Sequence, residues 1–129
     1  MTDLGFLIAR AMLAVIYILS GYAKLTAVAG IAKMLGDKGF PMPVAFGYAT
    51  GAVEFVGGLL LLIGFQARWA ALVLFAFTAG TIVIGHNFWV YEGAQYMAQR
   101  TQALKNLGIM GGFLMVVLAG PGRLSLDRR

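Results

Sequence analysis

The sequence predicts an all-α membrane protein, a bundle of four transmembrane helices with a short amphipathic interfacial helix between helices 1 and 2. Of the 129 residues, 60% are hydrophobic and 12% are charged, and the mean hydropathy is +0.84. A soluble domain carries about 25% charged residues, so this chain has too little polar surface to enclose a core in water. Four apolar segments each approach the roughly 20 residues that a spanning helix needs. Successive period-two alternation is absent from the sequence, which disfavours a transmembrane β-barrel.

In order along the chain, we expect one domain over residues 1–129, with helices at about 5–25, 43–65, 67–89 and 104–120. The residues at the start of the chain include Asp3, and no Lys or Arg occurs before Arg10. A signal peptide starts with positive charge, so we expect this segment to be retained as a span. With four spans, both termini lie on the same side of the membrane. The loop charges on the two sides nearly balance, so charge counting does not orient the chain.

The connection over residues 26–40 differs from the other loops. Apolar residues recur at Ile31 and Leu35, with Lys33 and Asp37 on the other side. This spacing predicts a short amphipathic helix that lies at the membrane interface.

One carboxylate, Glu54, lies in an otherwise uncharged run over residues 44–65. A charge in mid-membrane is costly, so such residues usually face the interior of a helical bundle and are candidate functional residues. At 1.5 Å per residue, Arg10 lies about 9 Å and Glu54 about 15 Å from the same membrane face. The difference of about 6 Å in depth is within reach of an arginine side chain. We therefore expect an Arg10–Glu54 ion pair. It either fastens two helices together or forms the floor of a pocket.

Polar residues gather where the predicted helices meet. Arg10, Tyr17 and Lys24 share one stripe of the first helix, because their spacing brings them to one face. Further cations and amides lie at the far ends of the helices. The candidate ligand-binding residues are Arg10, Tyr17, Lys24, Glu54, His86, Asn87, Lys105 and Asn106. Snorkelling lysines and helix caps are the alternative interpretation of this set. No residue is assigned as catalytic.

Composition excludes several chemistries. The chain has no cysteine and one histidine, His86, so thiol nucleophiles, iron–sulfur clusters and bis-histidine haem are excluded and a metal site is disfavoured. The formal net charge is +5. Without a dense basic stripe, this charge favours anionic lipid headgroups over nucleic acid. The expected partner is the lipid bilayer.

The ordered motifs of the chain resemble those of the DoxX family of small four-helix bacterial membrane proteins, over nearly its whole length. The matching elements are Arg10, Ser20-Gly21-x-x-Lys24-Leu25, Gly39-Phe40-Pro41, Glu54-Phe55-x-Gly57-Gly58, Gly64, Arg68, His86-Asn87-Phe88, Lys105-Asn106-Leu107 and Gly120-Pro121-Gly122-Arg123.

The resemblance implies a bacterial inner-membrane location, both termini in the cytoplasm, and a role near thiosulfate:quinone oxidoreductases or other membrane redox complexes. We therefore expect an accessory subunit of a quinone-linked redox system, with quinone as the possible cofactor and redox-complex subunits as possible partners. Whether the chain is itself an enzyme stays open, and a non-catalytic role is favoured because no flavin or haem motif is present. A transporter of a small anion or lipid, a purely structural membrane protein and a homo-oligomer stay open as alternatives.

Overall fold

The computed structural model describes residues 2–128. Over these residues the chain forms five α-helices and one 3-10 turn, and no strand. The elements are α1 (Thr2–Thr26), α2 (Ala29–Asp37), α3 (Pro43–Ile63), α4 (Ala67–Ile84), η1 (Phe88–Val90) and α5 (Gly93–Ala119). Helices α1, α3 and α5 and the segment that begins with α4 are long and apolar enough to cross a membrane. The fold class predicted from the sequence is therefore confirmed, with α2 as the short helix between the first two spans.

The outward faces of the long helices are apolar. Met12 and Leu19 of α1 are 72% and 64% exposed, and Met115 and Leu118 of α5 are 70% and 72% exposed. In water such a surface would cause aggregation, whereas in a bilayer it contacts lipid tails. The residues buried in the structure instead gather between the helices, around Leu61, Leu74 and Phe113.

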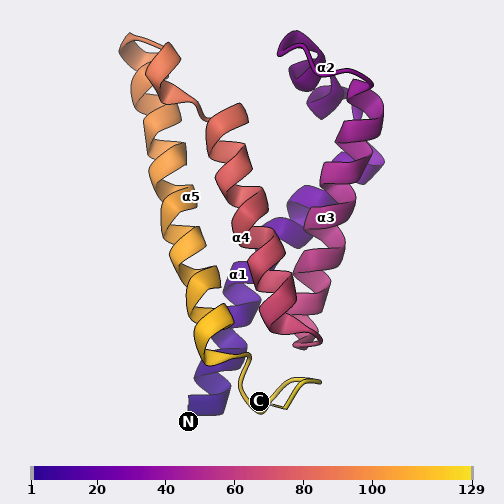
Figure 1. The fold of residues 1–129 in the computed structure, drawn as a ribbon, viewed down its shortest axis with the longest axis vertical. Coiled ribbons are helices and arrows are strands. Elements are labelled where there is room, and N and C mark those ends of the chain that lie inside the picture. Colours follow the sequence, from indigo (N-terminus) through magenta and orange to yellow (C-terminus); the bar gives the residue numbers. More distant parts are fainter. Residues whose placement is uncertain (1, 129) are drawn as a thin grey trace.

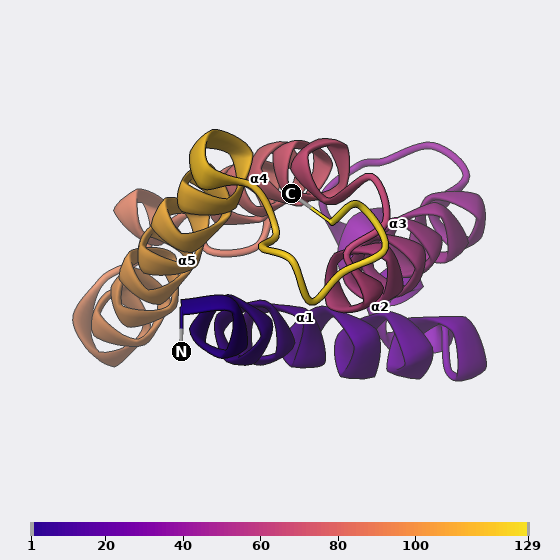
Figure 2. The ribbon, with the colours of Figure 1, turned by 90° about the horizontal axis from the view of Figure 1, so that it is seen from below.

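The four spans form two closely packed pairs, α1 with α3 and α4 with α5. Figure 1 shows the two pairs close together near the chain termini and separated at the opposite end, where α2 covers the top of α3. Both termini lie at the same end, as an even number of spans requires (Figures 1 and 2). The two pairs therefore converge at the terminal end of the bundle and diverge toward α2.

Glycines allow α1 and α3 to approach closely. A Cβ atom on Gly21 would lie 2.5 Å from the backbone nitrogen of Phe55 and 2.7 Å from the carbonyl oxygen of Gly51. Gly58 likewise faces the backbone of α1, where a Cβ would lie 3.2 Å from the Ala14 carbonyl oxygen. Small residues that bring two backbones together are the usual means of helix association in lipid. This contact places Glu54, between Gly51 and Gly58 on α3, directly against α1.

The terminal end is closed by Arg10, which is 1% exposed. Its guanidinium donates to the carbonyl oxygens of Leu61 (3.0 Å) and Leu62 (3.0 Å) at the end of α3, and to those of Leu124 (2.8 Å) and Pro121 in the C-terminal tail. The last carbonyls of a helix have no partner within the helix, so a buried arginine fork satisfies them here. The expected Arg10–Glu54 ion pair is therefore wrong, because Arg10 bonds to carbonyls at the terminal end of the bundle.

The C-terminal tail is fixed at the same place. Asp127 accepts hydrogen bonds from the backbone N–H groups of Gln66 and Ala67, each at 2.8 Å, and so caps the first turn of α4. The backbone of Asp127 also donates to the carbonyl of Gly64 at 2.9 Å. Gly64 has φ +72°, and a Cβ there would lie 2.2 Å from the Cβ of Ser125. The turn between α3 and α4 is thus shaped to receive the tail.

The helix bounds differ from those expected at two places. The third span ends as an α-helix at Ile84, so His86 and Asn87 lie in a break before η1. The fourth span begins at Gly93, eleven residues before the expected start at Leu104. At 1.5 Å per residue α5 is about 40 Å long, which exceeds a hydrocarbon core of about 30 Å. Its polar first turns therefore continue the helix beyond the core, which hydropathy does not detect.

Candidate functional site

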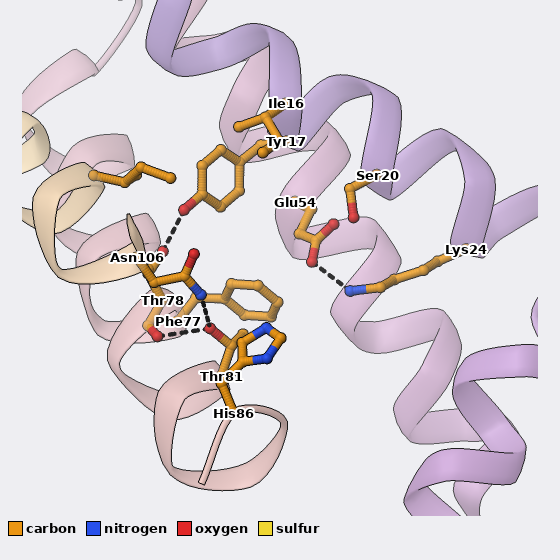
Figure 3. Close-up of a pocket in the computed structure, with 11 residues that line it drawn as sticks. Ile16, Tyr17, Ser20, Lys24, Glu54, Phe77, Thr78, Thr81, His86 and Asn106 are labelled. Carbon is orange, nitrogen blue, oxygen red and sulfur yellow. Dashed lines mark hydrogen bonds and ion pairs between the residues drawn. The ribbon is translucent and has the colours of Figure 1, made fainter. Parts of the chain in front are cut away.

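The polar pocket lies inside the bundle, where all four long helices meet. It has a volume of about 170 Å³. The residues that line it come from α1, α3, α4, the break after α4, and α5 (Figure 3); they are Ile16, Tyr17, Ser20, Lys24, Glu54, Phe77, Thr78, Thr81, His86, Asn106 and Ile109. Tyr17, Ser20 and Lys24 are spaced by three and four residues, so they share one face of α1.

The ion pair of this pocket joins Lys24 and Glu54. Lys24 Nζ lies 2.5 Å from Glu54 Oε1, and the side chains are 22% and 4% exposed. The second carboxylate oxygen, Oε2, is buried and has no hydrogen-bond partner among residues 2–128. A buried carboxylate oxygen without a partner is costly, so this atom is available to a donor on a bound ligand.

Lys24 is also placed against an aromatic ring. Its Nζ lies 5.6 Å from the centroid of the Phe77 ring, a separation at which a cation is attracted to the ring face. An ammonium group has three N–H donors, and Glu54 accepts one of them. Lys24 therefore retains donor capacity toward the pocket while its charge is balanced.

Hydroxyl groups of α4 fix the opposite wall. Thr78 Oγ1 donates to the Leu74 carbonyl at 2.7 Å, so at 2.5 Å from Thr78 the Tyr17 hydroxyl is the donor in their hydrogen bond. Asn106 Nδ2 donates to Thr81 Oγ1 at 3.1 Å, and Thr81 donates to the Thr78 carbonyl at 2.7 Å. The chain of bonds links α1, α4 and α5 across the pocket, so this wall is held in place before a ligand arrives.

His86 lies at the mouth of the pocket. Its Nδ1 is 2.8 Å from Gln99 Oε1, an acceptor, so Nδ1 carries a proton. The neighbouring residue Asn87 has a buried Oδ1 without a hydrogen-bond partner among the described residues, but it does not line the pocket.

The structure brings together part of the predicted site. Five of the eight candidates, Tyr17, Lys24, Glu54, His86 and Asn106, line the one pocket. The other three lie elsewhere: Arg10 at the terminal end, Asn87 behind the mouth, and Lys105 on the exposed side of α5. The Lys105 position fits the snorkelling interpretation.

Six pocket residues were not among the site candidates: Ile16, Ser20, Phe77, Thr78, Thr81 and Ile109. The sequence did contain a signal, since hydroxyl side chains three residues apart in an apolar helix mark one polar face. Serine and threonine are common in membrane helices for packing and backbone bonding, however, so the signal was weak.

An apolar pocket adjoins the polar one on the side of α2. Its volume is about 370 Å³, and most of its lining is apolar. It shares Lys24, Phe77, Thr81 and His86 with the polar pocket, and its other walls are Ile31, Met34, Leu35, Thr50, Gly80, Ile84 and Gly85. The two pockets thus meet at Lys24 and Phe77.

The size and polar groups of the polar pocket suit a small ring-shaped ligand. Residues 2–128 contain no group of three or more His, Cys, Asp or Glu side chains placed to hold a metal ion. A ring-shaped head group fits the polar pocket by size, because a cavity of about 150 Å³ in another protein accommodates benzene. Lys24 offers donors to a carbonyl oxygen, and Glu54 Oε2 offers an acceptor to a hydroxyl.

Comparison with known proteins identifies a matching family and similar inner membrane proteins. The DoxX family model matches residues 5–87, and the SURF4 family model matches residues 48–129. Inner membrane protein YphA of Escherichia coli K12 is 34% identical over 123 residues, which is 95% of this chain and 88% of that protein. Inner membrane protein YqjF of the same strain is 36% identical over 129 residues, which is 98% of this chain and 92% of that protein. No solved structure matches.

Proposed function

The chain belongs to the DoxX family, and on this premise we propose that it is an accessory subunit of a quinone-linked redox system, in which the polar pocket binds the quinone ring. The chain is a multi-pass inner membrane protein, since YphA and YqjF are inner membrane proteins and the structure has four apolar spans. The observation that carries the proposal is the Lys24–Glu54 pair, in which Glu54 is buried with an unpartnered Oε2 and Lys24 Nζ lies near the Phe77 ring.

The pocket residues can form hydrogen bonds with both the oxidised quinone and its reduced quinol form. A bound quinone would supply the capacity to take up two electrons and two protons. Lys24 Nζ donates to a quinone carbonyl, and Glu54 Oε2 accepts from the hydroxyl of the reduced form. Phe77 packs against the ring face, and the bonded hydroxyls of Tyr17 and Thr78 keep the opposite wall rigid. Because the ion pair is neutral overall, a neutral ring is a better fit than a free anion.

Electron transfer itself is assigned to a partner in this proposal. The chain has no cysteine, and no haem or flavin motif occurs in the sequence. If redox chemistry takes place at the pocket, the electrons therefore come from another subunit that carries a redox centre. Co-isolation of the chain with such a subunit, and slower respiration after its deletion, are the cellular results expected.

The binding test uses a short-chain ubiquinone analogue and purified protein in detergent. The double variant Lys24→Met/Glu54→Gln removes both charges and leaves no unpaired buried ion. We expect its affinity for the analogue to fall at least tenfold, because a hydrogen bond to a charged group contributes about 1.5–3 kcal/mol. Lys105→Met is the matched control, since it removes a lysine at the same end of the bundle that is exposed and outside the pocket.

The outcomes separate the proposal from a purely structural ion pair. Unchanged binding by a folded double variant would show that the pair serves only to hold α1 against α3. Loss of binding in Lys105→Met as well would show that removing any positive charge at this end has the same effect, and the pocket assignment would fail.

We also propose that both termini face the cytoplasm, which places the α2 end of the bundle toward the periplasm. The absence of cysteine from the sequence makes this simple to test, because one introduced cysteine is the sole labelling site. Lys38→Cys, in the connection after α2, should react with a membrane-impermeant maleimide added to intact spheroplasts. Labelling that occurs only after the membrane is broken would show the opposite orientation, with the termini in the periplasm.

A further inference from the structure

We infer that the ligand of the polar pocket carries a hydrocarbon chain, and that this chain lies in the adjoining apolar pocket between α2, α3 and α4. The inference rests on the proposed function and extends it from a ring to a lipid-soluble molecule with a head and a tail. Its basis is that the two pockets share Lys24, Phe77, Thr81 and His86, so a single molecule can occupy both.

The two pockets differ in the chemistry of the residues that they do not share. Charged and hydroxyl groups gather around Glu54, including Lys24, Ser20 and Thr78. Beyond Phe77 the lining changes to Ile31, Met34, Leu35 and Ile84, which offer only apolar contacts to the pocket. A head group that accepts and donates hydrogen bonds fits the first part, and a flexible hydrocarbon chain fits the second.

Helix α2 supplies one wall of the apolar pocket. Leu35 is buried at 5% exposed, and Ala32 at 8%, so this face of α2 is turned toward the bundle. The opposite face carries Lys33 and Asp37, which pair at 2.9 Å with side chains 79% and 66% exposed. An amphipathic helix of this kind covers the ligand's hydrocarbon chain with its apolar face and turns its polar face toward the membrane interface.

A single substitution at Gly80 of α4 can test whether the apolar pocket holds the ligand's hydrocarbon chain. It lines the apolar pocket and not the polar one. A Cβ atom on Gly80 would meet no atom within 4 Å, so a larger side chain can enter the cavity without a backbone clash. Gly80→Phe should therefore fill the space assigned to the chain, and replacing a helix-interior glycine also favours the helix.

Gly108 of α5 provides a matched control. A Cβ on Gly108 also meets no atom within 4 Å, but the residue lines neither pocket. Gly108→Phe thus adds the same ring to a membrane helix without entering the site.

The experiment compares three probes in full-length protein in detergent micelles: a ubiquinone analogue without a chain, decylubiquinone, and a long-chain alcohol that has no ring. Chain-bearing probes concentrate in micelles, so a difference in affinity within one protein does not establish chain binding. The comparison between variants removes this effect, because each probe partitions equally in all samples.

We expect Gly80→Phe to weaken decylubiquinone binding about tenfold and to leave the chainless analogue unchanged, while Gly108→Phe changes neither. If Gly80→Phe aggregates, Gly80→Leu repeats the test with a smaller side chain. Equal binding of decylubiquinone by Gly80→Phe and the wild type would overturn the inference and leave the ring site standing. Gly80-sensitive binding of the alcohol at the same affinity as decylubiquinone would also overturn it, since the cavity would then be a general lipid crevice. Failure of both quinones to bind the wild type would instead refute the proposed function.

Discussion

Removal of the charge on Lys24 is expected to destabilise the bundle more than removal of both charges of its ion pair. Lys24→Met leaves the Glu54 carboxylate, 4% exposed, without its partner at 2.5 Å. Breaking a buried pair in this way costs about 3–5 kcal/mol. Two unit charges about 4 Å apart interact by about 4 kcal/mol at an effective dielectric constant of about 20. The 22% exposure of Lys24 reduces this by solvent screening, so we expect a coupling energy of about 2 kcal/mol between the two sites.

The assay is a double-mutant cycle of Lys24→Met and Glu54→Gln, with the free energy of unfolding measured by SDS titration in mixed micelles. The exposed Lys33–Asp37 pair on α2 provides a control cycle, and its coupling should be indistinguishable from additivity because solvent screens both charges. Additive effects of the two substitutions would refute the expected coupling, because they would show that Lys24 and Glu54 do not stabilise each other despite their contact.

Three further substitutions test how the bundle is held together. Gly21→Leu should prevent the close approach of α1 to α3 and lower the free energy of unfolding by at least about 3 kcal/mol; Gly5→Leu, where a Cβ meets nothing within 4 Å, should unfold like the wild type in the same SDS titration. Arg10→Lys should lower stability by about 3 kcal/mol, because one ammonium cannot reach carbonyls on α3 and on the tail together; a change within error would contradict this. Asp127→Asn should lower it by about 1 kcal/mol through a weaker cap on α4, and faster proteolysis of the C-terminal tail would report the same loss.

The spans and α2 could be predicted from the sequence because hydropathy and helical spacing depend on residues close together in the chain. The early start of α5 could not, since its first turns are polar and a helix beyond the hydrocarbon core leaves no mark in hydropathy. The break after Ile84 falls at Gly85, His86 and Asn87, and the prediction ran the span past it because Phe88 and Trp89 resume the apolar run.

The ion-pair partner of Glu54 shows more clearly what could not be predicted from the sequence. Arg10 and Lys24 lie on the same stripe of α1, and spacing alone cannot say which of them meets Glu54. The choice depends on two features distant in sequence: the Gly21 contact, which sets the register of α1 on α3, and the carbonyl oxygens of Leu61 and Leu124, which accept hydrogen bonds from Arg10. Gly51 and Gly58, on the same face of α3 as Glu54, both contact α1 and so hold Glu54 against it.

The most direct test of the account is native mass spectrometry of the protein released from its own membrane. The account predicts that the wild type retains one quinone molecule, and that Lys24→Met/Glu54→Gln, extracted in the same way and still folded, does not. Wild-type protein that carries no quinone, or a double variant that retains it equally, would contradict the claim that the pocket around Lys24 and Glu54 is a quinone site.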